Sequence, residues 1–405
     1  MYDVAIVGIG IVSCLGTGIK KVSNSLKAGK SGIVIDTLRQ EMGFRSPLTA
    51  RIGDFVSPEL SRKQKKTLTE FGLWGYSASL EAIETAGWNK EEIQSSMTGL
   101  IIGNDSTALS NIESVDIVRN EKRTFSVGGA RIFKSLTSTV TMNLNTLLGN
   151  RGASWTLSSA CSSGGHAIGQ ASDLIKMGRQ ERIICGGVQE INWESVCSFD
   201  ATNAFSTNID NPEEASRPFD SERDGLVPGG GAAIVALERF DMAKKRGADI
   251  LGRVISYSFS SDGARLSLPS GDGLERCMGD VLKRGGKEVS DIDYISAHAT
   301  STPPGDLAEA GAIYNIFGTD CPWVSSFKSM TGHEMWMSGA SQVVYSTIMG
   351  MDGFIAKNLN FRKQEKDAPR LKIAMETIDK KPKTVLLNSA GFGGTNSCLI
   401  LEFEK

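Results

Sequence analysis

Histidine is scarce in this sequence, and cysteine occurs without any pairing pattern. Only three histidines are present among 405 residues, namely His166, His298 and His333, so any reaction that needs an imidazole must use one of them. The seven cysteines are odd in number and scattered, and none of them forms a CxxC pair. We therefore expect neither a disulfide framework nor a metal site.

Neither an excess of one charge nor a long apolar run is present. The 44 basic and 46 acidic residues leave a net charge of −2, which argues against a nucleic-acid partner. No apolar run reaches the roughly 18–20 residues that a membrane span needs. The first four residues carry no charged-then-apolar signal peptide. Hydrophobic residues at 40% and charged residues at 22% are typical of a packed globular protein, which we expect in the cytoplasm.

Short β-branched apolar runs alternate with amphipathic segments along the chain. Buried strands are expected at residues 4–7, 100–102, 155–157, 183–187, 232–237, 250–255, 294–297, 385–387 and 397–401. Helices are expected at residues 68–86, 274–282 and 306–317, where apolar residues recur at three- and four-residue steps. This alternation indicates an α/β layered fold. The charged connector 244–249 divides the chain into two α/β halves, 1–250 and 251–405.

Cys161 is the candidate nucleophile. It follows the strand at 155–157 and directly precedes a segment with helical spacing that ends near Gly178. A strand-to-helix turn exposes the sulfur and stabilises the thiolate through free backbone N–H groups and the helix dipole. The alternative is one more buried core cysteine. The other six cysteines lie in apolar or strand contexts and are expected in the core: Cys14, Cys185, Cys197, Cys277, Cys321 and Cys398.

Two of the three histidines lie in loops at predicted strand ends. His298 follows the strand at 294–297, and ligands in α/β sheets bind outside such ends. His333 ends an apolar and small stretch that contains Lys328, whose ammonium would be costly to bury without a partner. Asp306 and Glu309 are the candidate partners. His166 lies five residues after Cys161, about 140° around a helix, and is expected to be a hydrogen-bonded core residue.

Several motifs together resemble one family. They are Ser159–Ser163 around Cys161, His298 with Thr300–Asp306, Lys328–His333, Gly391–Asn396, Arg217–Asp220, Arg223–Gly225 and the opening Val7–Ser13. In this order and spacing they resemble the β-ketoacyl-ACP synthases, and most closely the type I elongation enzymes of bacterial fatty acid synthesis. The resemblance implies a thiolase-like fold, in which two similar βαβα halves form five layers, α/β/α/β/α, normally as a homodimer.

The resemblance also implies an acyltransferase reaction, a decarboxylative Claisen condensation. Cys161 would carry the acyl group, His298 and His333 would stabilise the malonyl enolate, and Lys328, paired with Glu309 and supported by Asp306, would position His333. The remaining implied roles are an oxyanion and gate loop at Gly391, Phe392 and Gly393, and phosphopantetheine contacts at Thr300 and Thr302. The phosphopantetheine arm arrives on the acyl carrier protein, so the chain is expected to carry no cofactor of its own.

Some residues depart from the family pattern. Ala299 and Ala390 stand where glycine and phenylalanine are common, and the bulky run 334–338 replaces small residues after His333. Acyl-pocket candidates are Val196, Phe199, Trp336 and Met337. These departures leave the acyl chain undefined, so a ketosynthase of a specialised polyene or polyketide-type pathway is the alternative to fatty acid elongation.

A basic cluster is a candidate docking surface for the acidic carrier protein. It comprises Arg62, Lys63, Lys65 and Lys66, with Lys122, Arg123 and Arg131 as further candidates. The alternative for each is a solvated helix face.

Two other functions are alternatives to a condensing enzyme. One is a non-catalytic chain-length subunit in a heterodimer, which usually lacks the cysteine, and the other is a CoA-dependent thiolase. The thiolase would need a second catalytic cysteine, and Cys398 lies in a strand-like run.

Overall fold

One sheet of 11 strands runs through the protein, and the computed structural model describes residues 1–403. The strands of the first half are β1 (Val4–Ser13), β2 (Gly16–Thr17), β5 (Thr98–Gly103), β6 (Ser154–Leu157), β7 (Arg182–Gln189) and β8 (Gly231–Arg239). Those of the second half are β9 (Gly252–Ser261), β10 (Tyr294–Ser296), β11 (Trp323–Ser325), β12 (Thr384–Gly391) and β13 (Thr395–Glu402). Every strand predicted from the sequence is present, mostly with longer bounds.

The two halves of the sheet repeat one topology. In the order β6-β5-β7-β8-β1, strand β5 runs parallel to β6 and β7, whereas β8 runs antiparallel to β7 and β1. In the order β11-β10-β12-β13-β9, β10 runs parallel to β11 and β12, whereas β13 runs antiparallel to β12 and β9. A short antiparallel pairing of β1 with β9 joins them. The division at residue 250 stays a prediction, although all strands before it lie on one side of this joint.

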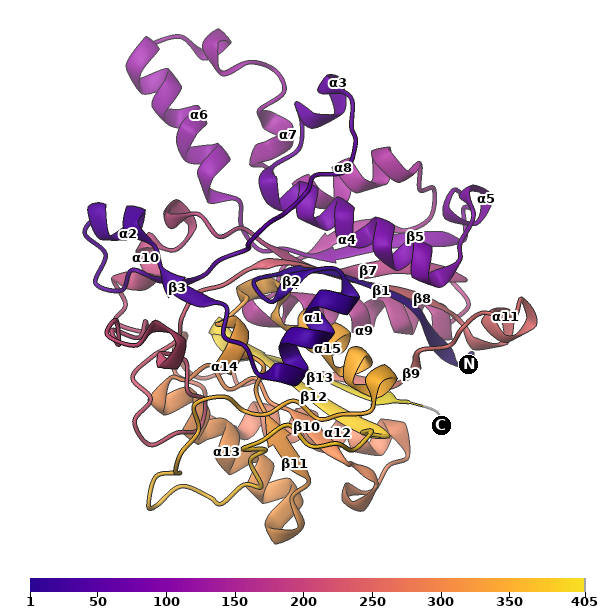
Figure 1. Cartoon of the computed structure of the whole chain (residues 1–405). Coiled ribbons are helices and arrows are strands. Elements are labelled where there is room, and N and C mark those ends of the chain that lie inside the picture. The colour runs from indigo at the N-terminus through magenta and orange to yellow at the C-terminus, as the bar shows by residue number, and fades with distance from the viewer. Residues whose placement is uncertain (404–405) are drawn as a thin grey trace.

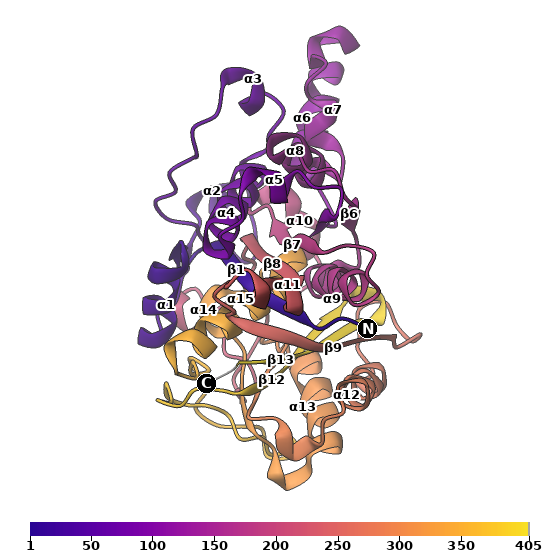
Figure 2. The same ribbon diagram turned by 90° about the vertical axis from the view of Figure 1, so that its right-hand side faces the viewer.

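Helices cover both halves and separate them, which gives the five predicted layers (Figures 1 and 2). Helices α4 (Glu70–Ala86) and α8 (Thr139–Leu148) cover the first half of the sheet. Helices α12 (Asp272–Gly285) and α13 (Pro303–Phe317) cover the second half. Between the halves lie α9 (Ser163–Lys176) and α15 (Ser338–Asp352), which pack against strands of both. The thiolase-like fold is therefore confirmed.

The remaining elements are short or lie at the surface. Their bounds are α1 (Ile19–Ala28), α2 (Thr37–Glu41), α3 (Arg62–Lys65), α5 (Lys90–Ile93), α6 (Ala108–Glu121), α7 (Ile132–Ser135), α10 (Cys197–Asp200), α11 (Phe240–Lys245), α14 (Lys328–Thr331), β3 (Ile33–Ile35) and β4 (Leu48–Ala50). Figure 1 shows α3, α6 and α7 projecting together above the body. Within residues 1–403 we find no helix that combines the length and apolarity of a membrane span.

Helix α4 illustrates how the sequence specifies a layer. The hydroxyl of Thr69 caps its first turn by accepting from the N–H of Gly72, and Gly87 ends it in the left-handed region at φ 66°. Strand β1 contributes glycine where the helix crosses it. A Cβ at Gly8 would lie 2.0 Å from the carbonyl oxygen of Ala82. Because Gly8 has no side chain, the backbone of β1 packs directly against the backbone of α4.

A second close approach brings the two central helices together. A Cβ added at Gly339 of α15 would lie 2.4 Å from the backbone nitrogen of Gly165 in α9. Because both helices begin at this contact, the residues that precede them are neighbours in space. Cys161 precedes α9 and His333 precedes α15.

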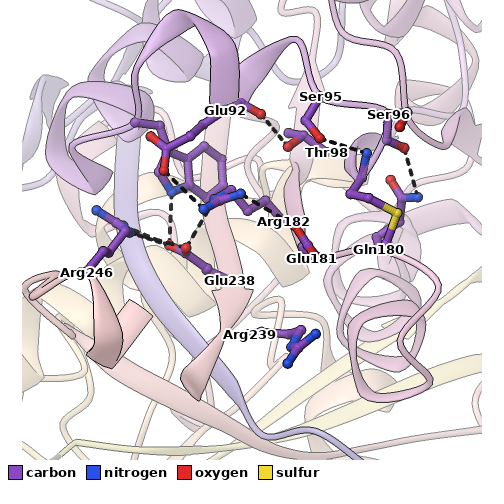
Figure 3. Close-up of polar contacts among 12 residues, drawn as sticks. Glu92, Ser95, Ser96, Thr98, Gln180, Glu181, Arg182, Glu238, Arg239 and Arg246 are labelled. Atoms are coloured by element: carbon purple, nitrogen blue, oxygen red, sulfur yellow. Dashed lines mark hydrogen bonds and ion pairs between the residues drawn. The ribbon is translucent and has the colours of Figure 1, made fainter. Parts of the chain in front are cut away.

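A buried ion network joins the start of β7 to the end of β8 (Figure 3). Glu238 is fully buried and forms ion pairs with Arg182 at 3.1 Å and with Arg246 at 2.7 Å. Arg182 also reaches Glu92 at 3.0 Å, and the indole N–H of Trp88 donates to Glu238 at 3.0 Å. Removing one partner of such a network costs about 3–5 kcal/mol. This network is remote from the β7 end that meets the turn before α15.

Candidate active site

Cys161 lies on a tight turn between β6 and α9. The preceding residue, Ala160, has φ 47°, a left-handed conformation that is rare for a residue with a side chain. Ser163 secures this turn: its hydroxyl donates to the carbonyl of Ala160 at 2.6 Å and accepts from the N–H of Ser159 at 2.8 Å. The predicted strand-to-helix position of Cys161 is confirmed.

The predicted exposure of the sulfur is wrong. Cys161 is only 5% exposed, because it packs in an apolar cluster with Val196, Leu226 and Trp336. Burial raises the pKa of the Cys161 thiol to about 12, against the opposing effects of the Lys328 ammonium and the backbone N–H groups of Phe392 and Cys161. The free site therefore holds a thiol, and the expectation of a stabilised thiolate does not apply to it.

His333 contacts the sulfur directly. Its Nε2 lies 3.1 Å from Sγ of Cys161, and its Nδ1 lies 3.0 Å from the hydroxyl of Ser338. Burial and the Lys328 ammonium hold the pKa of His333 well below its usual value, so the imidazole is neutral. When Ser338 donates to Nδ1, the single ring proton lies on Nε2 and points toward Cys161.

His298 lies just after the end of β10 and is the second histidine of the site. Its ring centroid lies 5.3 Å from that of His333, with the two planes at 87°. Glu309 of α13 fixes the loop by accepting from the backbone N–H groups of His298 at 2.8 Å and Ala299 at 2.6 Å. Asn388 donates to the same carboxylate at 3.2 Å. Burial and the Lys328 ammonium lower the pKa of His298 well below its usual value, so it too is neutral.

Lys328 begins α14 and is 3% exposed. Burial lowers the pKa of its ammonium to about 8, while the charges of Glu309 and Glu334 oppose that shift. Across residues 1–403, no ion pair within 4 Å joins Lys328 to Glu309 or Asp306. The predicted direct pairing is therefore wrong, because both carboxylates are occupied by backbone N–H groups, and they act on Lys328 only through the electrostatic field.

Asp306 has a different role from the one predicted. Its carboxylate accepts from the N–H groups of Phe219 at 2.8 Å and Ser301 at 3.1 Å, and lies 3.6 Å from Nε of Arg223. These contacts join the 217–223 segment to the loop after His298. Asp306 therefore supports the site by holding two loops together.

A cavity of about 400 Å³ leads to these residues. Cys161, His298 and His333 lie in its lining, as do Thr300 and Thr302, whose hydroxyl oxygens are 2.9 Å apart. Gly391 and Phe392 form one wall, and Phe392 is 42% exposed. Gly393 has φ 80° and donates its N–H to the carbonyl of Leu266 at 2.8 Å. The structure thus brings the predicted gate loop and the two threonines to the same cavity.

Three of the four acyl-pocket candidates lie beside Cys161. Val196, Phe199 and Trp336 belong to its apolar cluster. The ring of Phe199 stacks on Phe392 with centroids 5.7 Å apart, and the indole of Trp336 donates to the hydroxyl of Ser106 at 3.2 Å. Met337 is the exception.

The fourth candidate is placed wrongly. Met337 is 0% exposed in the core around α9 and α15, because the turn after His333 directs it away from the cavity. Met335 lines the cavity in its place. The reversal of direction follows from the left-handed φ of 42° at Met335, which no periodicity in the sequence reveals.

The basic docking candidates lie at the surface and outside the cavity lining. Arg62, Lys63, Lys65 and Lys66 are exposed on and after α3, which a capping box of Ser61 and Gln64 begins. Lys122 and Arg123 are exposed after α6, whereas Arg131 forms an ion pair with Glu113. Arg265, which the sequence did not single out, lies in the lining itself.

The other histidine and cysteines lie elsewhere. His166 Nδ1 lies 2.7 Å from the hydroxyl of Tyr257, which confirms the prediction that His166 forms a hydrogen bond away from Cys161. Cys398 is buried in β13 and donates to Asn388 at 3.4 Å. Cys197 is exposed on α10, so its predicted core position is wrong, because that short helix lies at the surface. Among residues 1–403, no cluster of three or more His, Cys, Asp and Glu side chains has the geometry to hold a metal ion.

Sequence reasoning missed several residues of the site. Ser338 and Asn388 contact His333 and Glu309 respectively, yet each is one polar residue within an apolar or small run. Glu334 was identified from the sequence only as part of a departure from the family pattern. A carboxylate in a buried stretch nevertheless indicates that nearby groups donate hydrogen bonds to it. No spacing in the sequence indicates the contact of Ser338 with His333, because a left-handed turn at Met335 separates the two residues.

Comparison with known proteins agrees with this geometry. The family model described as "Beta-ketoacyl synthase, N-terminal domain" matches residues 1–243, and "Beta-ketoacyl synthase, C-terminal domain" matches residues 251–362. The 3-oxoacyl-[acyl-carrier-protein] synthase 1 of Haemophilus influenzae is 38% identical over 405 residues, covering 99% of each chain. A crystal structure of a beta-ketoacyl synthase from Burkholderia phymatum superimposes with a TM-score of 0.95 at 30% identity, covering 100% of each chain.

A second similar structure is a type II PKS acyl-carrier protein in complex with its ketosynthase. It has a TM-score of 0.89 and 25% identity, and the match covers 100% of both chains. The family models match both halves of the chain, and the relative from Haemophilus influenzae is 38% identical over the full length. The chain belongs to the β-ketoacyl synthase family.

Proposed function

We propose that this chain is a 3-oxoacyl-ACP synthase, an acyltransferase that extends an acyl chain by decarboxylative condensation with malonyl-ACP. The observation that carries the proposal is the contact between Cys161 Sγ and His333 Nε2 at 3.1 Å, with His298 beside it, in the lining of a cavity of about 400 Å³. A nucleophile and two neutral imidazole donors are what this reaction requires.

The first step transfers the acyl group to Cys161. The sulfur attacks the thioester carbonyl carbon of acyl-ACP, the new S–C bond forms, and the bond to the arm's sulfur breaks. The thiol proton leaves with the phosphopantetheine sulfur. The backbone N–H groups of Cys161 and Phe392 already face the Cys161 sulfur and would bind the developing oxyanion.

The second step generates the carbon nucleophile. Malonyl-ACP loses carbon dioxide, and the electron pair of the broken C–C bond moves onto the thioester oxygen as an enolate. His298 and His333 donate hydrogen bonds to that oxygen, because both are held neutral and each retains one ring proton. Lys328 adds positive potential nearby.

The third step joins the two fragments. The enolate carbon attacks the acyl-Cys161 carbonyl, a C–C bond forms, and the Cys161–carbon bond breaks. The departing thiolate takes up one proton, which restores the thiol. The products are β-ketoacyl-ACP and carbon dioxide.

The acyl carrier protein is the proposed partner, and no cofactor beyond its arm is invoked. The ketosynthase in the similar complex is bound to its acyl-carrier protein. Thr300 and Thr302 line the cavity and offer hydroxyls to the amides of a phosphopantetheine arm. The exposed basic residues of α3, with Lys122 and Arg123, offer charge to an acidic carrier.

We also propose that the protein works as a homodimer in the cytoplasm. Strand β6 ends the sheet, and its Trp155 is exposed. Further exposed apolar residues lie on α6, on α7 and in the segment around them: Ile112, Val115, Phe125, Ile132, Phe133 and Leu136. An open sheet edge and an exposed apolar surface of this kind favour pairing with a second copy. Seven free cysteines fit a reducing compartment.

The test is to incubate the purified chain with acyl-ACP and malonyl-ACP and detect β-ketoacyl-ACP by mass spectrometry. Formation of that product by the isolated chain supports the proposal. Absence of both acylation and product would instead support a chain-length subunit that needs a catalytic partner. The mass from size-exclusion chromatography decides between a homodimer and a heterodimer subunit. The acyl group retained on Cys161 in the native host distinguishes fatty acid elongation from a polyene or polyketide-type pathway.

A further inference from the structure

Glu334 is a buried carboxylate that the proposed mechanism does not use. It follows His333 directly and is 2% exposed. The hydroxyls of Ser341 and Tyr345, both from the first two turns of α15, donate to its two oxygens, the latter at 2.8 Å. These two donors offset the cost of burying the carboxylate, which would be strongly destabilising if it were unpaired.

These contacts connect Glu334 to the orientation of His333. The Ser341 hydroxyl that donates to Glu334 also contacts the carbonyl of Ser338 at 3.0 Å, and the Ser338 hydroxyl contacts Nδ1 of His333 at 3.0 Å. The N–H of Met337 donates to the carbonyl of Glu334 at 3.0 Å. The segment between His333 and Ser338 is thereby held against α15 from both its backbone and its side chains.

That segment needs such an anchor. Met335 lies in it with φ 42°, a left-handed conformation that a residue with a side chain adopts only when its surroundings enforce it. Met335 also lines the cavity beside Cys161. A loss of the Glu334 contacts would release the turn that places both His333 and Met335.

The negative charge of Glu334 acts on the buried ammonium of the site through the electrostatic field, and among residues 1–403 no ion pair within 4 Å joins the two groups. The groups with charge or titration near Lys328 are Glu309, Glu334, Cys161, Asp306 and the neutral imidazoles of His298 and His333. Glu309 already receives three N–H donors, and Asp306 faces Arg223. Glu334 receives hydroxyl donors only, and Tyr345 and Cys14 are its other titratable neighbours. Glu334 therefore adds its negative charge to the electrostatic field that favours the ammonium form of Lys328.

Burial sets the range of pH in which this charge acts. It raises the pKa of Glu334 to about 7 and lowers that of Lys328 to about 8. Glu334 is a carboxylate above its pKa and Lys328 an ammonium below its own. Both are charged together only in the interval between the two values.

We infer that Glu334 is a positioning residue for the condensation, which anchors the turn carrying His333 and holds Lys328 in its ammonium form. The inference rests on the proposed function. It assigns to Glu334 no contact with substrate, since His333 and Lys328 carry its effect to the reacting atoms.

The test compares pH profiles of malonyl-ACP decarboxylation for the wild type and Glu334→Gln. Glutamine keeps an acceptor for Tyr345 but removes the charge. Below pH 7, where Glu334 is neutral, the two rates should agree within about twofold. Above it, the variant should lose several-fold in rate, and its alkaline limb should move to lower pH by about 1 unit, because the Lys328 ammonium loses a stabilising charge. Glu81→Gln removes another partly buried carboxylate, remote from Lys328, and should leave the limb in place.

Two outcomes separate the inference from the proposed function. If the wild type forms no β-ketoacyl product, the proposed function fails. If the wild type is active and the profile of Glu334→Gln superimposes on it from pH 6 to 9, the inference fails.

A second variant covers the case in which Glu334→Gln does not fold. Ser341→Ala removes one donor to Glu334, and because that hydrogen bond lowers the pKa of Glu334, its loss narrows the interval in which both groups are charged. The rate between pH 7 and 8 should then fall several-fold relative to the rate at pH 6. An unchanged ratio of these two rates would overturn the inference.

Discussion

Sγ of Cys161 lies 3.1 Å from Nε2 of His333, although 172 positions separate the two residues in the chain. They occupy equivalent places in the two halves, one directly before α9 and the other before the turn that leads into α15. The contact of Gly165 with Gly339 brings those helix ends together. The nucleophile and its imidazole therefore meet because the two halves repeat one topology, and the following predictions depend on that arrangement.

Replacing the nucleophile should abolish acyl transfer and condensation, the two steps in which a bond to Cys161 forms or breaks. Cys161→Ala leaves no sulfur to accept the acyl group, and loss of a nucleophile costs on the order of 10³-fold or more in rate. Intact-protein mass spectrometry after incubation with acyl-ACP should show no acyl adduct. Cys197→Ala, which removes an exposed thiol, is the matched control and should keep wild-type activity. Equal activity of the wild type and Cys161→Ala would contradict the mechanism.

The condensation rate should fall as the pH rises past about 8. Burial lowers the pKa of Lys328 to that value, so its ammonium is present below it and lost above it. The measurement is kcat/KM for malonyl-ACP from pH 6 to 9.5. Lys328→Arg should flatten the alkaline limb, because guanidinium stays protonated throughout this range. A wild-type rate that stays constant to pH 9.5 would show that the ammonium is not needed.

Trp336 should limit the length of the acyl chain. The indole packs beside Cys161 and Phe199, so Trp336→Ala opens space next to the acyl-bearing sulfur. The variant should accept chains several carbons longer than the wild type does, in a competition among acyl-ACPs of C4 to C14 read by mass spectrometry. It should also lose about 3–5 kcal/mol of unfolding free energy.

Met337→Ala is the control for Trp336. Met337 lies in the core around the central helices, so its truncation should cost about 2–5 kcal/mol without changing the preferred chain length. A similar shift in chain length for both variants would indicate general loosening of the site.

The left-handed conformation of Gly393 should be needed for acyl transfer. Gly393→Ala adds a Cβ that meets nothing within 4 Å, so its effect is conformational and costs about 1–2 kcal/mol at φ 80°. Because the N–H of the preceding Phe392 faces the Cys161 sulfur, we expect acylation to slow about 10²-fold in single-turnover assays. Gly247→Ala imposes the same strain at φ 70° in the remote connector and should leave the acylation rate unchanged. Equal rates for the two variants would exclude a role for the loop.

Charge reversal on α3 should weaken docking of the carrier protein. Lys63→Glu places a negative charge on the exposed basic surface, so we expect KM for acyl-ACP to rise several-fold and its dependence on salt to decrease. The decarboxylation of a malonyl thioester without a carrier should be unaffected. Lys244→Glu, on α11, is the charge-matched control. If both variants raise KM equally, the α3 surface is not the specific docking site.

Local patterns were sufficient for much of the fold. The short β-branched runs predicted strands because such runs suit a sheet covered on both faces, and each is a strand in the structure. Helix α4 was predicted within two residues at its start, because small residues at helical spacing and Gly87 mark its face and its end. The strand-to-helix turn at Cys161 was likewise visible from the sequence.

Local patterns failed where the chain reverses direction or where burial changes chemistry. The left-handed backbone at Met335 turns Met337 into the core and Met335 into the cavity. The direct pairing of Lys328 with Glu309 and Asp306 was wrong, because backbone N–H groups of the loop after β10 and of the segment at Phe219 occupy those carboxylates.

The sequence by itself determined the layered α/β class, the nucleophile and the two histidines that can act with it, because these depend on residue type and on short-range periodicity. Only the tertiary structure decided that His166 bonds Tyr257, that the Cys161 thiol is buried and protonated, and that hydroxyls of α15 donate to Glu334. Burial and the electrostatic field depend on contacts between segments far apart in the chain, such as the contact between Cys161 and His333 across 172 positions. Helix geometry in the sequence had already set His166 apart from Cys161, and packing supplied its hydrogen-bond partner and brought His298 and His333 to one cavity.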